Sequence, residues 1–192
     1  MSSQKHGKIF EERIQKSLGY EEVSNTQEYD IPSDYHPDKL PMHIKLIKNN
    51  SAICMSDARR IWSQAEQRRV LLVGFYNQKG SYKYISEIYE IMLTAEMKRD
   101  LFGSVSLEEV KQFHEGIKSF SFGKHTCARE YAKSQKKKLS PFLGIVQLNP
   151  KIDSQRQRRL QCSISKKDFV NLIKKYPECL NIPLAEFGEV IK

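Results

Sequence analysis

The chain has 192 residues, of which 39% are hydrophobic, and 32 Lys and Arg against 23 Asp and Glu give it a formal net charge of +9. This length suits one domain, with or without a small extension, and the charge favours a polyanion such as nucleic acid as partner. The sequence has no apolar run long enough to span a membrane, no apolar signal-peptide centre and no CxxC pair, so we expect a cytoplasmic protein without a membrane span, zinc site or disulfide framework.

Residues 5–18 are predicted to form a helix, because apolar residues recur on one face. They are Phe10, Ile14 and Leu18, with Ile9 alongside. Gly19 is placed to end this helix as a C-cap residue. Glu11 lies at the edge of the apolar face, so its side chain can point toward a site on an adjoining sheet. Glu12 lies nearly opposite and should be exposed to solvent.

The segment 42–48 alternates as a half-buried strand does, and this places His43 and Lys45 on the same face, roughly 7 Å apart. Asp30 precedes His43 by thirteen positions and follows a short predicted strand. An Asp at a strand end, a turn-rich connection and a strand carrying X-Ile-Lys together are typical of a divalent-metal phosphodiesterase. The carboxylate would hold the metal, and Lys45 would hold the attacking water and the scissile phosphate.

Two alternatives to this site remain open from the residues alone. The segment can be a surface hairpin with a solvated Lys45. In addition, the proline-rich connection over 32–41 contains Asp34 and Asp38, and either acid could replace Asp30 as the ligand. Short strands are expected at 20–24 and 28–31, before this connection.

A helix is predicted after the central strand, with Ser56 as its N-cap and Asp57 in its first turn. Arg59 and Arg60 begin this helix and can contact phosphate or simply face solvent. The strands that follow are 69–76, apolar enough to be covered on both faces, and 82–93, which can instead break near Ser86.

The second half contains predicted helices at 96–102, 106–118, 124–138 and 169–176. Capping-box patterns open two of them, Ser106-x-x-Glu109 and Ser165-x-x-Asp168. Strands at 142–148 and 159–164 are expected to pair around the Asn149-Pro150 turn signal. Two basic segments, KSQKKK and SQRQRR, are either solvated or bind phosphate. Their candidate DNA-binding residues are Lys136, Lys137, Arg156 and Arg158.

The order helix, strand, strand, strand, helix, strand over residues 5–76 resembles the core of the PD-(D/E)XK nucleases, which include restriction endonucleases and archaeal-type Holliday junction resolvases. Gly7, Phe10 and Glu11 stand where the first helix of that family often has Gly, an apolar residue and Glu. Asp30 and His43-Ile44-Lys45 stand as its Asp and (D/E)-x-Lys elements.

The resemblance implies an α/β fold, a three-layer α/β/α sandwich around a central mixed β-sheet. This restriction-endonuclease-like core would cover about residues 5–93, within a single nuclease domain. A helical and β-hairpin C-terminal extension would cover about residues 94–192.

It also implies Mg²⁺-dependent hydrolysis of a DNA phosphodiester, with Mn²⁺ as a substitute. Asp30 would bridge the ion, Glu11 would help from the helix, and the Ile44 carbonyl and His43 would complete the protein ligands, while Lys45 polarises the water. His43 departs from the family, which normally has a carboxylate there, because imidazole adds no negative charge and Mg²⁺ prefers oxygen. Either Glu11 and Asp30 do most of the metal holding, or the site is catalytically weak, or it is inactive. A further alternative is that His43 is simply hydrogen-bonded in the fold.

One such site cuts one strand of double-stranded DNA, and a short chain leaves little surface for reading a sequence. The chain therefore resembles the small cleavage subunit of a heterodimeric Type IIS restriction endonuclease, whose larger subunit recognises the DNA. The alternatives are a homodimeric junction-resolving or repair nuclease, and a non-catalytic DNA-binding module on a decayed nuclease core.

Overall fold

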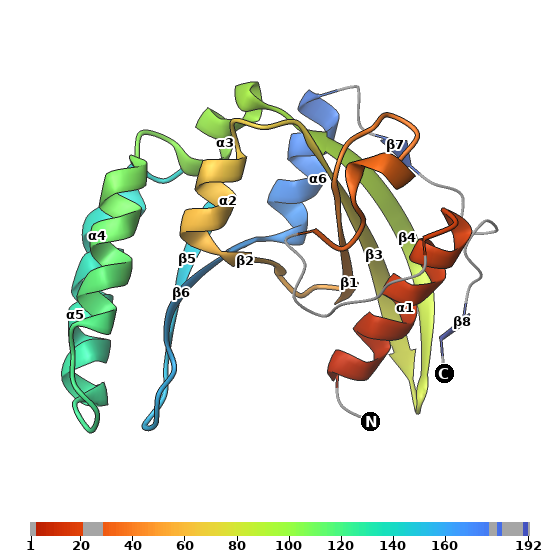
Figure 1. Ribbon diagram of the computed structural model, residues 1–192. Helices are drawn as coiled ribbons and strands as arrows, with labels where there is room; N and C mark the ends of the chain where they lie inside the picture. The colour runs from red at the N-terminus through yellow and green to blue at the C-terminus, as the bar shows by residue number, and fades with distance from the viewer. Residues whose placement is uncertain (1–2, 21–28, 177–179, 182–189, 192) are drawn as a thin grey trace. The chain divides into compact units, whose positions relative to one another are not determined.

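A computed structural model describes residues 3–20, 29–176, 180–181 and 190–191 of the chain (Figure 1). The chain forms two compact units, which are described separately: a first unit of residues 1–51, 68–93 and 170–192, and a second unit of residues 52–67 and 94–169. One boundary lies near residue 94, where the sequence suggested a subdivision. Residues 52–67 nevertheless belong to the second unit, so the first unit is not the continuous stretch 5–93.

The first unit is built on a mixed sheet. Its elements are α1 (Ser3–Ser17), the 3₁₀ turn η1 (Ser33–Tyr35), β1 (Met42–Lys48), β3 (Arg69–Lys79), β4 (Tyr82–Leu93), β7 (Leu180–Asn181) and β8 (Val190–Ile191). The strand order is β1-β3-β4-β7, and β8 also pairs with β4. β1 and β3 run parallel, whereas β4 runs antiparallel to β3. The predicted α/β class with a mixed sheet is therefore confirmed.

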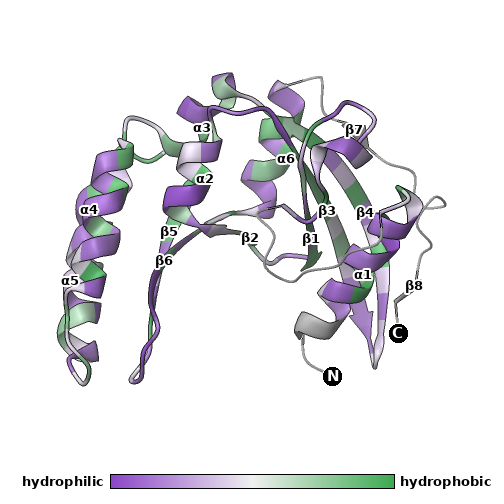
Figure 2. Cartoon of the chain, viewed as in Figure 1, coloured by the Kyte–Doolittle hydropathy of each residue, from purple (hydrophilic) through white to green (hydrophobic). Residues whose placement is uncertain are grey.

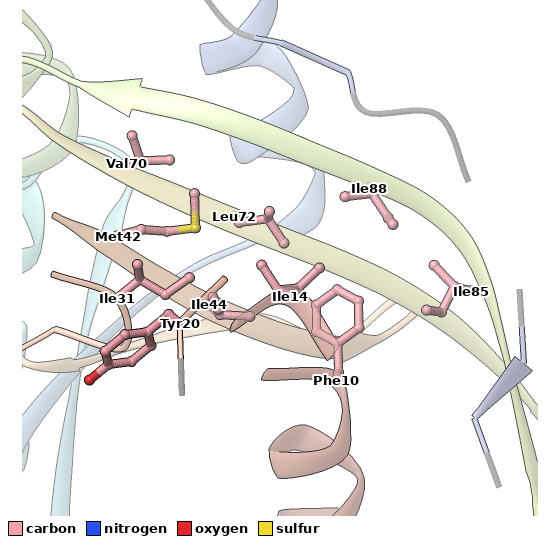
Figure 3. Packing of buried hydrophobic residues seen from close by; sticks show 10 residues of the cluster. All are labelled: Phe10, Ile14, Tyr20, Ile31, Met42, Ile44, Val70, Leu72, Ile85 and Ile88. Atoms are coloured by element: carbon pink, nitrogen blue, oxygen red, sulfur yellow. The ribbon is translucent and has the colours of Figure 1, made fainter. Parts of the chain in front are cut away.

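Helix α1 packs its apolar face on the sheet, as its spacing predicted. Phe10 and Ile14 are fully buried and join a cluster with residues of β1, β3 and β4, shown in Figure 3. The helix approaches β3 at Gly74, where a Cβ atom would lie 2.7 Å from the Phe10 ring. Gly19 adopts φ +71° just past the helix end, so the predicted C-cap is confirmed.

The long strands β3 and β4 also agree with the sequence. β3 is buried from Arg69 to Tyr76, and β4 has the predicted bounds. Ser86 lies at a bulge, because Phe75 pairs with Glu87 while the next residue, Tyr76, pairs with Ile85. The predicted break near Ser86 is therefore a bulge within one continuous strand.

The second unit is a three-stranded antiparallel sheet with helices packed on it. Its elements are β2 (Ile53–Asp57), α2 (Ala58–Gln64), η2 (Ala95–Met97), α3 (Lys98–Phe102), α4 (Leu107–Lys118), α5 (His125–Leu139), η3 (Ser140–Phe142), β5 (Val146–Ile152) and β6 (Arg158–Ile164). The strand order is β2-β6-β5, α4 contacts β6, and α5 contacts β5. Helix α6 (Lys166–Lys175) starts at the end of this unit, with the predicted Ser165 and Asp168 pair at its beginning.

Figure 2 contrasts the apolar residues along β1 and β3 with the mostly hydrophilic end of the β5–β6 hairpin.

The predicted capping box of α4 is present, since Ser106 accepts from the Glu109 amide and Glu109 accepts from the Ser106 amide. No helix among the described residues is both long and apolar enough to cross a bilayer.

Two local predictions in the second unit were wrong. Asp57, rather than Ser56, caps α2, because its carboxylate accepts from the amides of Arg59 and Arg60. Ser56 belongs instead to the unpredicted strand β2, at a bulge where its φ is +91°. Asn149-Pro150 lies inside β5 and not at the hairpin turn, which spans residues 153–157. A proline is tolerated there because β5 is an edge strand.

These differences divide the segment that resembled one nuclease core. β2 and α2 lie between β1 and β3 in the sequence but belong to the second unit, where β2 joins the other sheet. Of the two short strands expected before β1, residues 21–28 lie outside the described part of the chain. Ile31 forms an isolated antiparallel bridge with Met42.

Candidate functional site

The candidate site lies at the outer edge of β1. Met42 directs its amide and carbonyl away from β3, where they bond with the backbone of Asp30 and Ile31. Backbone groups of alternate strand residues point to the same edge, so Ile44 directs its amide and carbonyl to this side as well. The Ile44 amide donates to Oδ2 of Asp30 at 2.6 Å. The short bridge at Ile31 thus fixes the Asp30 carboxylate against β1.

The structure brings His43 and Lys45 to the same carboxylate. Lys45 Nζ lies 3.4 Å from Asp30 Oδ2, and His43 Nδ1 lies 3.8 Å from it. Met42 and Ile44 are buried in the cluster with α1, while His43 and Lys45 project from the other face, as the alternation predicted. His43 is 6% exposed and Lys45 is half-buried.

These contacts keep Asp30 ionised. Burial alone would raise the pKa of the Asp30 carboxyl, but His43, the charge of Lys45 and the Ile44 amide together lower the pKa to about 2. Because His43 Nδ1 lies beyond ordinary hydrogen-bond length, we assign most of this stabilisation to Lys45 and Ile44. The carboxylate therefore stays charged across the physiological range and can hold a cation.

Two residues that the sequence did not single out support this geometry. Gln15 of α1 is 3% exposed, and its amide donates to the Asp30 carbonyl at 2.9 Å. The Tyr29 ring packs against the His43 ring, with 5.0 Å between the ring centroids. Gln15 could have been found, because it lies four residues after Glu11 and so on the same side of the helix. Nothing in the sequence singles out Tyr29.

Glu11 is half-buried and Glu12 exposed, as predicted. However, no group of three or more His, Cys, Asp or Glu side chains arranged to hold a metal occurs among the described residues. The structure thus does not bring Glu11, Asp30 and His43 together as a preformed three-ligand set. The alternative acids Asp34 and Asp38 are exposed on the loop, and it is Asp30 that contacts Lys45.

The donor atoms at the edge of β1 fit a hard cation held by few protein ligands. All hydrogen bonds and ion pairs of the Asp30 carboxylate with described residues go through Oδ2, so Oδ1 is open to a further partner. The Ile44 carbonyl points to the same edge. His43 Nδ1 lies on the same side, 3.8 Å from Oδ2 of this carboxylate.

The candidate DNA-binding residues all lie in the second unit. Arg59 pairs with Asp57 at 3.5 Å and Glu115 at 3.1 Å, and Arg60 donates to Ser56. Beside them, burial lowers the pKa of His114, and the charge of Arg59 lowers that pKa further. The Arg59 guanidinium is therefore paired with two carboxylates of its own unit.

The other four cations divide into two surfaces. Lys136 lines a groove between α5 and β5, whereas the neighbouring Lys137 is exposed. Arg156 is exposed at the β5–β6 turn, and Arg158 lines a cleft beside it.

In comparisons with known proteins, no family model, no curated protein and no solved structure matches this chain. The resemblance to the PD-(D/E)XK nucleases therefore rests on the order and spacing of its own motifs.

The lowered pKa of Asp30 predicts an acid-dependent loss of stability. The ionised carboxylate stabilises the fold above its ordinary pKa of 3.8, and this contribution, about 2 kcal/mol, should be lost as pH falls toward 2. Asp30→Asn keeps an acceptor for the Ile44 amide but has no charge to titrate. Urea unfolding between pH 5 and pH 2 should therefore show a smaller decline in the variant. Asp34→Asn, a change at an exposed acid, should follow the unaltered protein, and equal declines in all three proteins would contradict the assignment.

Proposed function

We propose that the chain is a metal-dependent DNA endonuclease that hydrolyses one strand of duplex DNA, with a PD-(D/E)XK-like site at the edge of β1 in a restriction-endonuclease-like core. The proposal is carried by one observation. The Asp30 carboxylate, the Ile44 main chain and the Lys45 ammonium meet within 3.4 Å at the outer edge of β1, in the order and spacing of that motif.

Each residue has a distinct chemical task in this proposal. Asp30 Oδ1 and the Ile44 carbonyl would hold a divalent ion, with His43 Nδ1 as a third donor. Mg²⁺ or Mn²⁺, when bound, would supply an activated water and offset charge on the phosphate. Lys45 Nζ lies 3.4 Å from Asp30 Oδ2, where it would donate to the attacking water and to the phosphate oxygen. Gln15 and the Ile44 amide keep the Asp30 backbone and carboxylate in place.

The net charge of +9 supports duplex DNA as the substrate, because phosphate contacts by Lys and Arg release counterions. A single active site of this kind would hydrolyse one strand of the duplex. We therefore propose a larger DNA-recognising endonuclease subunit as partner, which would cut the other strand.

A second candidate is a DNA-binding module on a decayed nuclease core. It is favoured by the absence of a three-ligand group among the described residues and by the presence of His43 where a carboxylate is usual. The two candidates are separated by incubating supercoiled plasmid with the protein and its partner in Mg²⁺, in Mn²⁺ and in EDTA. Metal-dependent nicking or cutting supports the nuclease, whereas DNA binding without cleavage in either metal supports the module.

His43 should set the metal preference if it is a ligand. Imidazole is a softer donor than carboxylate, so activity in Mn²⁺ relative to Mg²⁺ should fall by about tenfold in His43→Glu. Initial cleavage rates across a range of each metal measure this ratio. His43→Ala distinguishes a lost ligand from an added charge, because it removes the imidazole without supplying a carboxylate. The same ratio in all three proteins would exclude ligation by His43.

A further inference from the structure

The second unit contains a cleft of about 320 Å³ that the nuclease chemistry does not use. It lies between the loop that joins α4 to α5 and the turn of the β5–β6 hairpin, and its lining residues are Phe120, Phe122, Gln155, Arg156 and Arg158. This volume falls at the lower end of the range for small-molecule sites. Two aromatic rings and two guanidinium groups in one small cleft are suited to a flat, anionic ligand.

The two rings have different roles in the cleft. Phe120 is half-buried, and its ring packs 5.7 Å from that of Tyr131, which in turn contacts Phe113. Phe122 is 77% exposed. The Phe120 ring thus packs against α5, while the Phe122 ring is largely exposed and available for an aromatic ligand to stack on.

Arg158 is held in place before any ligand arrives. Its side chain is 9% exposed, and Nη1 donates to the carbonyls of Asp153 at 2.8 Å and Gln157 at 2.9 Å. Its Nε is buried without a hydrogen-bond partner among the described residues. Asp153 lies 3.9 Å from Nη1 and is itself bonded to the backbone of the turn. The guanidinium is therefore fixed in the cleft wall, where it adds a positive charge to the lining.

A basic groove of about 380 Å³ adjoins this cleft. Arg129, Lys133 and Lys136 lie at i, i+4 and i+7 on one face of α5, opposite Pro150 and Ile152 of β5. Ile152 is the strand partner of Arg158, so the groove and the cleft meet at this pair. No acidic residue is among the described residues that line either hollow. A row of cations that ends at an aromatic cleft is suited to a nucleic-acid strand whose last base has left the stack.

We propose that the second unit binds an unpaired DNA nucleotide, with its base stacked on Phe122 in the cleft and the adjoining phosphates along the groove of α5. A base inside a duplex has both faces covered by its neighbours, so this site would distinguish a single-stranded end from intact duplex. Arg156 and Arg158 would contact the phosphate of the stacked nucleotide, and the Gln155 amide can bond a base edge. The inference goes beyond the proposed nuclease activity and does not require it.

The test measures binding of the full chain, in EDTA, to a fluorescein-labelled duplex with a four-nucleotide single-stranded overhang and to the matching blunt duplex. The unaltered protein should bind the overhang more tightly than the blunt end. Phe122→Ala should weaken overhang binding by about tenfold and leave blunt-end binding unchanged. Fluorescence of 2-aminopurine in the overhang should be quenched by the unaltered protein and not by the variant, which is a signature of stacking.

Phe142→Ala is the matched control, because Phe142 is also an exposed phenylalanine of this unit, at 58%, and lies outside the cleft. It should change neither affinity. Equal binding of overhang and blunt duplex, or unchanged quenching in Phe122→Ala, would overturn the proposal. Tighter binding to a ribonucleotide overhang of the same sequence would overturn the assignment to DNA.

Discussion

Asp30→Ala or Lys45→Ala is expected to reduce metal-dependent DNA cleavage by at least about 100-fold, the scale on which ion-holding and proton-positioning groups act. Asp30 supplies the only carboxylate that contacts Lys45 among the described residues, and Lys45 supplies the ammonium at the same edge of β1. Plasmid nicking rates at saturating Mg²⁺ and Mn²⁺, with the partner present if one is needed, measure the loss.

The controls separate a lost site from a lost fold. Lys48→Ala changes an exposed lysine at the end of the same strand and should retain full activity. Asp30→Ala leaves the Ile44 amide without its acceptor, which costs about 1–3 kcal/mol, so Asp30→Asn serves as a second variant that keeps an acceptor. Full activity in a folded Asp30 or Lys45 variant would place the chemistry elsewhere.

The purified chain alone is expected to cleave weakly or without specificity and to bind DNA mainly through charge. Sequence reading needs base contacts or shape readout over several base pairs, and the proposed partner would supply them. With that larger subunit present, the chain should cut one strand at a fixed distance from the recognised site. Asp30→Ala in the complex should then convert double-strand cleavage into nicking, because the site of the larger subunit still acts. Agarose gels that separate nicked from linear plasmid measure the change.

Lys45→Ala should give the same nicked product, since it disables the same site. Gel filtration should show the chain alone as a monomer. Sequence-specific double-strand cleavage by the purified chain, together with a dimer in gel filtration, would contradict the partner requirement and favour a homodimeric enzyme.

The cleft at Phe122 could not be predicted from the sequence. The basic segment containing Arg156 and Arg158 was recognised as a phosphate-binding candidate, but Phe120 and Phe122 lie more than thirty positions earlier. Only the packing of the α4–α5 loop beside the β5–β6 turn joins them. Similarly, Arg59 pairs with Glu115, which is 56 residues away in sequence. Residues near Arg59 in the sequence therefore could not show whether its charge is available to DNA.

The sequence by itself determined the features that depend on residues a few positions apart. The face of α1 follows from Phe10 and Ile14, the alternation of β1 places His43 and Lys45 together, and Ser106 with Glu109 begins α4. Each is set by the helix or strand repeat, or by a hydrogen bond within one turn.

Only the tertiary structure decided which strands pair and which side chains meet. β2 follows β1 closely in sequence yet pairs with β6. β5 can contain Pro150 because this strand lies at the edge of its sheet. Asp30 reaches Lys45 because the bridge between Ile31 and Met42 folds the preceding loop back along β1. Strand pairing depends on burial and backbone hydrogen bonding between segments far apart in the chain, which no local pattern specifies.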